Sequence, residues 1–324
     1  MSAASFSLLR ILADGEVHNA ERIGRALGLS RIEVEALGRD LEALGLSLHK
    51  PGGTGYRLEA PIDLYDVNLL TEQMSTVAPG LRLEILDECV STNTELAIRA
   101  RAGAEHGTVL VCEHQSAGRG RRGNAWVSAI GGSVTFSMLW RFSLGAGRLA
   151  GLSLAVAVAA AKALEKLGIG GIAVKWPNDL FRGDRKLGGI LIETTGDAAG
   201  ATAAIIGIGV NTRLRPAERE RIGRPAADIA SSPGVIPSRT AVLVGLLESV
   251  AASLELFSGE GFAPFREAWL SRHAWQGRQV VLSLAENRVA EGRVVGVADD
   301  GALELTSAQG IKRFHAGELS LSLE

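Results

Sequence analysis

The chain has 324 residues, of which 46% are hydrophobic and 22% are charged, a balance that excludes wholesale disorder and predicts two or three folded domains. Its 34 basic and 36 acidic side chains give a net charge of −2, so any nucleic-acid binding must depend on a local basic patch. The two cysteines, Cys89 and Cys112, lack the spacing of metal ligands, which predicts neither a disulfide framework nor a zinc site.

The apolar segments predict a protein without a membrane anchor. The longest apolar run, residues 149–161, is shorter than the ~20 residues that a membrane-spanning helix needs. The N-terminus lacks the basic start and apolar core of a signal peptide. We therefore expect a cytoplasmic protein with no membrane partner.

Residues 1–63 show the order of helix, helix, short turn, helix and hairpin. Ser30 and Glu33 have the spacing of a capping box, in which each side chain bonds the other residue's backbone amide. The third helix would begin there and end at Gly45. Short apolar alternations on both sides of residues 51–55 predict the hairpin. This order is typical of a winged helix-turn-helix, whose last helix enters the DNA major groove.

The charge of this segment leaves two interpretations open. Residues 1–63 carry seven basic and nine acidic side chains, and the expected reading helix is itself acidic. Because phosphate contacts supply much of the affinity for DNA, a small packing unit without a DNA role is the alternative. If the segment binds DNA, the candidate contacts are Arg22, Arg31, Arg39 and Lys50.

After a linker at residues 61–63, strands alternate with helices through residues 64–274. Apolar runs of strand length and pattern lie at residues 108–113, 133–141, 172–176, 187–194 and 203–210. Such alternation, with much strand pairing, predicts a mixed α/β domain.

Three further stretches of this domain carry local signals. Thr92 and Glu95 have capping-box spacing and predict a helix that runs to about residue 101. A longer helix is expected from about residue 148 to residue 167. Residues 213–235, rich in Arg, Pro, Ala and Ser, predict a mobile loop.

Residues 275–324 form the third predicted domain, a small β-barrel. Its strand-like runs lie at residues 280–284, 293–297 and 302–305. The pair Asp300-Gly301 between two of them is a strong signal for a hairpin turn.

The most unusual stretch is residues 115–126, in which the sequence GRGRRG occupies positions 118–123. Glycine lets a backbone approach an anion closely, and guanidinium groups make paired contacts with phosphate or carboxylate. No Gly-Lys-Ser/Thr follows, so this is not a Walker A loop. Taken alone, the stretch is also consistent with a solvated Arg/Gly loop that touches RNA or nothing.

A second cationic cluster spans residues 175–179, with the sequence KWPND, and continues at residues 185–193. A buried lysine at position 175 would be costly unless an anion paired with it. The alternative is an exposed edge lysine followed by an ordinary turn. Recurring cationic clusters in one domain favour a polyanionic ligand, and the glycines at 207 and 209 suit its close approach.

Together these motifs resemble those of biotin–protein ligases in order and spacing. The matching segments are GRGRRG at 118–123 with Trp126, KWPND at 175–179, KLGGILIE at 186–193, GIGVN at 207–211, and the short biotin-site motif Ser91-Thr92-Asn93. With the N-terminal segment and the C-terminal barrel, the chain resembles the bifunctional bacterial family of biotin ligase and biotin-operon repressor. The resemblance implies an α+β multidomain protein with a catalytic domain related to class II synthetases and an SH3-like C-terminal domain.

The resemblance also implies a reaction. Biotin is activated with ATP to biotinyl-5′-adenylate, and is then transferred to a lysine of the biotin carboxyl carrier protein of acetyl-CoA carboxylase. Because a carboxylate and a triphosphate must be brought together, cationic neutralisation should dominate catalysis, with Mg²⁺ sharing that load. The loop at 116–126 should close over the adenylate and exclude water.

Matched to the family's motifs, the site residues fall into three overlapping groups. Biotin would be bound by Ser91, Thr92, Asn93, Gln115, Arg119, Gly120, Arg121 and Lys186. The nucleotide would be bound by Arg121, Arg122, Trp126, Lys175, Asn178 and Asn211. The catalytic residues would be Arg119, Arg121, Lys175, Asp179 and Lys186, with Asp179 as a proton acceptor for the incoming lysine.

Regulation in this family implies a homodimer that forms on ligand binding and contacts two operator half-sites. The glycine-bearing strands 187–194 and 203–210 are candidates for edge-to-edge pairing in that dimer. Ser322 stands where an arginine near the adenylate is expected.

Two other functions are compatible with the sequence. A lipoate-type ligase shares the adenylation chemistry, although the arginine-rich loop favours biotin. A biotin-sensing transcription factor would bind the same ligand without turnover.

Overall fold

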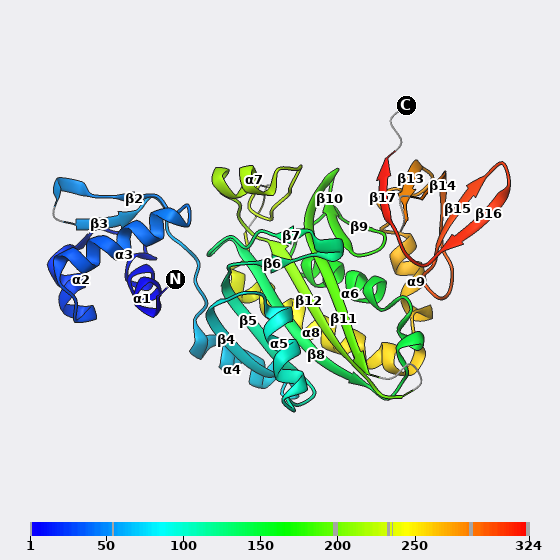
Figure 1. Cartoon of the computed structure of the whole chain (residues 1–324), viewed down its shortest axis with the longest axis horizontal. Helices are drawn as coiled ribbons and strands as arrows, with labels where there is room; N and C mark the ends of the chain where they lie inside the picture. The colour runs from blue at the N-terminus through cyan, green and yellow to red at the C-terminus, as the bar shows by residue number, and fades with distance from the viewer. Residues whose placement is uncertain are drawn as a thin grey trace.

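The computed structural model describes residues 2–53, 55–196, 200–231, 234, 236–284 and 288–321. Along the chain there follow a small N-terminal unit, a large central sheet with its helices, and a smaller C-terminal sheet, which lie side by side in Figure 1.

The N-terminal unit consists of three helices and a three-stranded antiparallel sheet in the order β1-β3-β2. Its elements are α1 (Ala3–Leu12), β1 (His18–Asn19), α2 (Ala20–Leu27), α3 (Arg31–Ala43), β2 (Leu48–His49) and β3 (Gly55–Leu58). The predicted capping box at the start of α3 is confirmed, since Ser30 and Glu33 bond each other's backbone amides. The strand β1 was not predicted, because two residues carry no periodic pattern.

The central sheet has seven strands in the order β4-β5-β8-β12-β11-β10-β9. Their bounds are β4 (Arg82–Cys89), β5 (Thr108–Gln115), β8 (Ser133–Phe142), β9 (Ile172–Lys175), β10 (Asp179–Arg182), β11 (Arg185–Gly196) and β12 (Thr202–Asn211). Only the pair β4 and β5 is parallel; every other pair of neighbours is antiparallel.

The side chains of β8 point alternately to the two faces of the sheet and show what covers each face. Val134, Phe136 and Met138 belong to the main core with α4 (Val67–Val77), α6 (Leu152–Lys166), α8 (Arg239–Glu260) and α9 (Ala263–Leu270). Leu139 points the other way, into a separate small cluster with Leu96 of α5 (Thr92–Arg101). One face therefore carries a layer of several helices, and the other carries α5 (Figure 1).

Two helices of the described chain are long and apolar enough to cross a membrane, judged by length and composition only: Ala146–Lys166, which is α6 with its lead-in turn, and Arg239–Glu260. The expectation that no apolar segment reaches that length was wrong. Both helices pack against the sheet in the main core, where a long apolar helix is ordinary. The longer predicted helix also starts later than expected, at Leu152, because Gly151 adopts a left-handed conformation.

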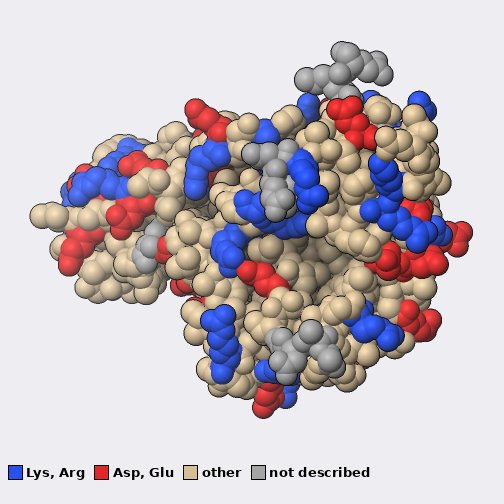
Figure 2. All heavy atoms as spheres, turned by 45° about the vertical axis from the view of Figure 1, so that its right-hand side comes forward, with Lys and Arg blue, Asp and Glu red and all other residues tan. Residues whose placement is uncertain are grey.

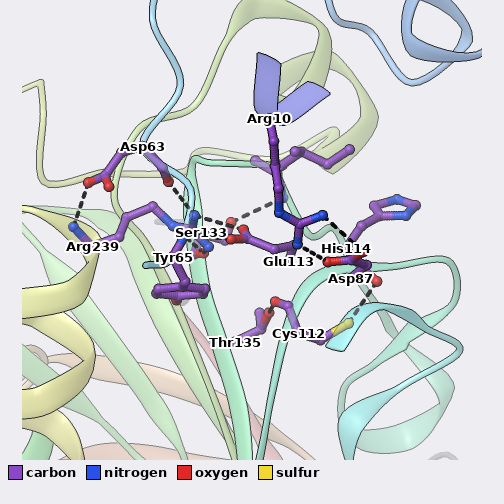
Figure 3. A network of polar contacts seen from close by, with 12 residues as sticks. Arg10, Asp63, Tyr65, Asp87, Cys112, Glu113, His114, Ser133, Thr135 and Arg239 are labelled. Atoms are coloured by element: carbon purple, nitrogen blue, oxygen red, sulfur yellow. Dashed lines mark hydrogen bonds and ion pairs between the residues drawn. The ribbon is translucent and has the colours of Figure 1, made fainter. Parts of the chain in front are cut away.

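The linker from the N-terminal unit is fixed to the sheet by a buried polar network, which we call the clasp (Figure 3). Arg239, 1% exposed, donates through Nε and Nη2 to the carbonyl oxygen of Ser133 at 3.1 and 2.9 Å and through Nη1 to Glu113 at 2.8 Å. Glu113 also accepts from the backbone amide of Tyr65 at 2.7 Å, and Asp63 accepts from the amide of Arg239 at 2.7 Å. The clasp thereby determines where the chain enters the central domain.

The C-terminal sheet is antiparallel, in the order β16-β15-β14-β13-β17. Its strands are β13 (Gln279–Ser283), β14 (Val289–Val297), β15 (Leu303–Ser307), β16 (Gly310–Phe314) and β17 (Glu318–Leu321). The predicted hairpin turn at Asp300-Gly301 joins β14 to β15, with Gly301 at φ 79°.

Two structural expectations fail within the central domain. The segment 213–235 was predicted to be a mobile loop, yet its described part contains α7 (Pro216–Ile222), held by an ion pair of 2.7 Å between Arg219 and Asp228. The strands β11 and β12 were proposed as edges for dimer pairing, but both lie in the interior of the sheet. The edges are β4 and β9, so edge-to-edge pairing through β11 or β12 is excluded.

Candidate active site

One cavity of about 860 Å³, part of it open to solvent, lies on the face of the sheet that α5 covers only partly. Figure 2 shows lysine and arginine side chains gathered beside the hollow on this side of the molecule. Thirteen residues predicted from the sequence line it: Ser91, Thr92, Asn93, Gln115, Arg119, Gly120, Arg121, Arg122, Trp126, Lys175, Asn178, Asp179 and Lys186. Cationic groups that are far apart in the sequence therefore meet around a single space.

The start of α5 provides the uncharged polar end of the cavity. The amide of Thr92 donates to Oε1 of Gln115 at 2.7 Å. The hydroxyl of Ser137, on the cavity-facing side of β8, lies 2.6 Å from Oδ1 of Asn93 and 2.7 Å from Oγ1 of Thr92. The predicted capping role of Thr92 is wrong, because Ser91 is the N-cap and makes no side-chain cap bond. Hydrogen bonds with Gln115 and Ser137 thus fix Thr92 and Asn93 at the edge of the cavity.

The glycines of β12 line the cavity and admit neighbouring side chains. A Cβ atom at Gly207 would lie 2.1 Å from Oδ1 of Asn93, and one at Gly209 would lie 2.5 Å from the ring of Trp126. Asn93 and Trp126 closely approach these two glycines, and close approach by a ligand stays a prediction. Both side chains are thereby placed on the cavity wall.

The cationic end of the cavity is formed by β9, β10 and β11. Nζ of Lys186 lies 2.5 Å from Oδ1 of Asp179, and Nζ of Lys175 lies 3.9 Å from Oδ2 of the same carboxylate. The Lys175 side chain is only 12% exposed and lies 4.5 Å from the ring centre of Trp275, which excludes an ordinary exposed edge lysine. Burial lowers the pKa of Lys175, and the nearby Lys186 lowers it further, while Asp179 opposes the shift.

The arginines of the loop take different positions. Nη1 of Arg121 makes one long hydrogen bond of 3.4 Å to Asn178, and burial together with neighbouring Arg122 lowers its pKa. Arg122, at φ 55°, donates to the carbonyl oxygen of Ser283 at 3.2 Å and so ties the loop to the C-terminal sheet. Arg119 lies at the rim, 49% exposed, in an ion pair of 2.9 Å with Glu193. Arg121 is therefore the loop guanidinium with most donors left for a ligand.

Asn211 lies outside this cavity, in a second pocket of about 840 Å³ that shares Trp126 and Lys186 with it. Nδ2 of Asn211 donates to the carbonyl oxygen of Ala227 at 3.1 Å. Oδ1 of Asn211 and Nε1 of Trp126 are buried and have no hydrogen-bond partner within the described chain. Both residues line the second pocket.

The four DNA-contact candidates lie on the N-terminal unit, away from the cavity. Arg22 is exposed on α2, and Arg31 on α3 donates to the carbonyl oxygen of Gly53 in the hairpin at 3.1 Å. Lys50 and Arg39 lie 3.6 and 4.0 Å from the carboxylate of Glu35.

Some residues that line the cavity or hold its lining were given no role from the sequence. Ser137 holds Thr92 and Asn93, yet it looks like one polar residue in an apolar strand; Glu193 pairs with Arg119, yet it figured only as the end of a matched motif. Gly317, Glu318 and Leu319 reach the cavity from the C-terminal sheet, which no local pattern indicates. Ser322, singled out for the arginine it replaces, lies outside the described residues.

Comparison with known proteins defines the class. Residues 88–211 match the biotin/lipoate A/B protein ligase family, and residues 277–322 match the biotin protein ligase C-terminal domain. The fold, the cavity and these matches define a ligase of the biotin and lipoate type.

Full-length relatives specify the family further. The bifunctional ligase/repressor BirA of Salmonella typhimurium is 35% identical over 97% of this chain and 96% of its own length, and that of Escherichia coli is 34% identical over the same shares. A biotin protein ligase from Aquifex aeolicus, solved in complex with biotin and ATP, has a TM-score of 0.63 at 30% identity, covering 75% of this chain and 99% of that chain. This chain belongs to the biotin protein ligase family.

Proposed function

We propose that the protein activates biotin with ATP to biotinyl-5′-adenylate and transfers biotin to a lysine of the biotin carboxyl carrier protein of acetyl-CoA carboxylase. The observation that carries this proposal is the polarity of the cavity, with uncharged hydrogen-bonding groups at one end and clustered cations at the other. Biotin has the same polarity, with a neutral ureido head group and an anionic carboxylate.

The uncharged end binds the head group. Thr92, Asn93, Gln115 and Ser137 already hold one another at hydrogen-bonding distance, so little side-chain entropy is lost when the ligand arrives. Ser91 and Gly120 line the same space.

The cationic end stabilises charge during both steps. In the first step a carboxylate oxygen of biotin attacks the α-phosphorus of ATP, and the bond to pyrophosphate breaks. Arg121, Lys175 and Lys186 neutralise the phosphoryl oxygens in a partly desolvated site, where such contacts are stronger than in water. In the second step the carrier lysine attacks the acyl carbon and AMP leaves. Asp179 orients Lys186, and we assign to the same carboxylate the proton of the incoming amine.

The second pocket takes the nucleotide base. The ring of Trp126 gives it a flat wall, and the unpartnered Oδ1 of Asn211 and Nε1 of Trp126 suit the donors and acceptors of adenine. Lys186, which lines both pockets, lies between acid and nucleotide.

The cavity residues fit a Mg²⁺ ion that is bound mainly by the triphosphate of ATP, not one held by protein ligands alone. Within the described chain no three His, Cys, Asp or Glu residues gather as a metal cluster. The cavity carboxylates Asp179 and Glu318 already face cations. Mg²⁺ often keeps few protein ligands and binds substrate phosphates, so the triphosphate would hold it and the amide oxygen of Asn178 would be the candidate protein ligand. When bound, the metal supplies further neutralisation of phosphate charge.

A second function, ligand-dependent repression, is favoured by the N-terminal unit. We propose that residues 1–63 form a winged helix-turn-helix, residues 64–274 the catalytic domain and residues 275–324 an SH3-like domain. The element order of the N-terminal unit and its exposed cations on α2, α3 and the hairpin support DNA binding by a ligand-induced homodimer. Such a protein acts in the cytoplasm, where the carrier and the operator are both present.

Transfer of labelled biotin to a carrier domain, with ATP and Mg²⁺, tests the ligase function. We expect ATP-dependent labelling that Lys186→Met abolishes and that Lys162→Met, at an exposed position of α6, leaves unchanged. Preferential transfer of lipoate would identify a lipoate ligase instead. Binding of biotin without any turnover would identify a sensing transcription factor.

A further inference from the structure

Two of the four acidic residues of α3 lie away from its exposed cations. Glu33 is held back in the capping box with Ser30. Asp40 accepts a hydrogen bond of 3.1 Å from the hydroxyl of Ser5 on α1. Two of the carboxylates that make this helix acidic are therefore turned away from its outward surface.

The outward surface of α3 is a stripe of apolar side chains and one cation. At 100° per residue, Ile32, Ala36, Arg39 and Ala43 fall within one narrow sector, opposite the buried side chains of the helix. Ile32 is 77% exposed, the largest exposed fraction among the large hydrophobic residues of the described chain. The short side chain of Ala36 leaves room for close approach.

Two acidic residues of α3 remain: Glu42 is exposed near its C-terminal end, and Glu35 is neutralised by cations from two elements. Glu35 lies 3.6 Å from Lys50 beside the hairpin and 4.0 Å from Arg39 one turn along α3. Arg31 bridges the start of the helix to the hairpin through the carbonyl oxygen of Gly53. Three cations, Arg31, Arg39 and Lys50, therefore lie in or beside the apolar stripe, and outnumber the two exposed carboxylates of Glu35 and Glu42 there.

We infer that α3 reads thymine through a direct contact between Ile32 and the C5 methyl group in the major groove, with Arg39 and Lys50 against the adjoining phosphates. The thymine methyl is the apolar group that base pairs present in that groove, so it is the group that an exposed isoleucine can cover. This inference rests on the proposed repressor function and adds the base that the helix selects.

Duplexes selected from a random pool by the full chain, with biotin and ATP, provide the test. Each thymine of an enriched duplex is replaced in turn by deoxyuridine, which lacks only the methyl group. We expect one replacement in each half-site to weaken binding about fourfold, the value for one buried methyl. Ile32→Ala should bind thymine and deoxyuridine duplexes equally. Ile311→Ala, at an isoleucine 60% exposed on the C-terminal sheet, should keep the discrimination.

The outcomes separate the two claims. An enriched duplex that tolerates deoxyuridine at every position, or Ile32→Ala that still discriminates, overturns the methyl contact and leaves the repressor function standing. If no duplex is enriched, the repressor function itself fails and the methyl contact with it.

Discussion

Replacing Arg239 by methionine should destabilise the central domain severely. The side chain is 1% exposed and donates to Ser133 twice and to Glu113 once, so the variant leaves a buried carboxylate without its cation. Breaking a buried ion pair from one side costs about 3–5 kcal/mol. Methionine has a similar volume, so little of the loss comes from a cavity. We expect the free energy of unfolding to fall by about 4 kcal/mol.

The partner variant Glu113→Gln breaks the same buried ion pair from the other side and should cost about 3 kcal/mol, the lower end of that range. Glutamine keeps an acceptor for the amide of Tyr65, and Arg239 keeps both bonds to the carbonyl oxygen of Ser133. In the double variant no charge remains unpaired. Its loss should therefore be smaller than the sum of the single losses by about 1 kcal/mol or more.

Urea unfolding followed by tryptophan fluorescence measures these differences, since Trp140, Trp176 and Trp269 are buried in the same core. Arg148→Met, at an exposed arginine, is the matched control and should change stability by less than about 0.5 kcal/mol. An Arg239→Met variant as stable as this control, or fully additive single losses, would refute the clasp.

Three further predictions concern the cavity and pH. Gly207→Ala should weaken biotin binding at least about tenfold, because its Cβ would lie 2.1 Å from Oδ1 of Asn93; calorimetry should show no change for Gly80→Ala, which has open space. Burial lowers the pKa of His273 to about 4, whereas an unfolded histidine titrates near 6.5, so the unfolded state binds the extra proton between these values. Stability should therefore fall by about 3 kcal/mol more in the wild type than in His273→Gln as pH drops from 7 to 4, and parallel curves would contradict this. Because burial lowers the pKa of Lys175, the rate of adenylate formation should decline with rising pH below the range in which an ordinary lysine loses its proton. The variant Lys175→Arg, if it remains active, should lack that decline. If the variant shows the same decline at high pH, Lys175 is not the group that causes it.

The sequence predicted the features that depend on local pattern or on several matched motifs. The capping box at Ser30 and Glu33 and the alternation of β8 are local, and both are present in the structure. The gathering of Arg121, Lys175 and Lys186 around one cavity followed from motifs that only a shared ligand would explain.

Features that depend on strand order or on tertiary contacts could not be predicted from the sequence. A glycine-bearing strand looks the same at an edge and in the interior, so the wrong edge assignment of β11 and β12 followed from composition alone. The helix α7 was hidden in an arginine- and proline-rich segment, although Arg215 donates through its backbone amide and its Nε to the carboxylate of Glu218 at the start of the helix. Ser137 contacts Thr92 and Asn93 of α5, and the sequence of β8 alone does not indicate that contact.

A crystal structure of the protein with biotinyl-5′-adenylate would show whether one cavity holds both ends of the intermediate. We expect the head group against Asn93 and Gln115, and the acyl-phosphate oxygens within hydrogen-bonding distance of Lys186 and Arg121. An adenylate bound elsewhere, or one whose phosphate faces solvent while these cations stay paired only with protein groups, would contradict that expectation.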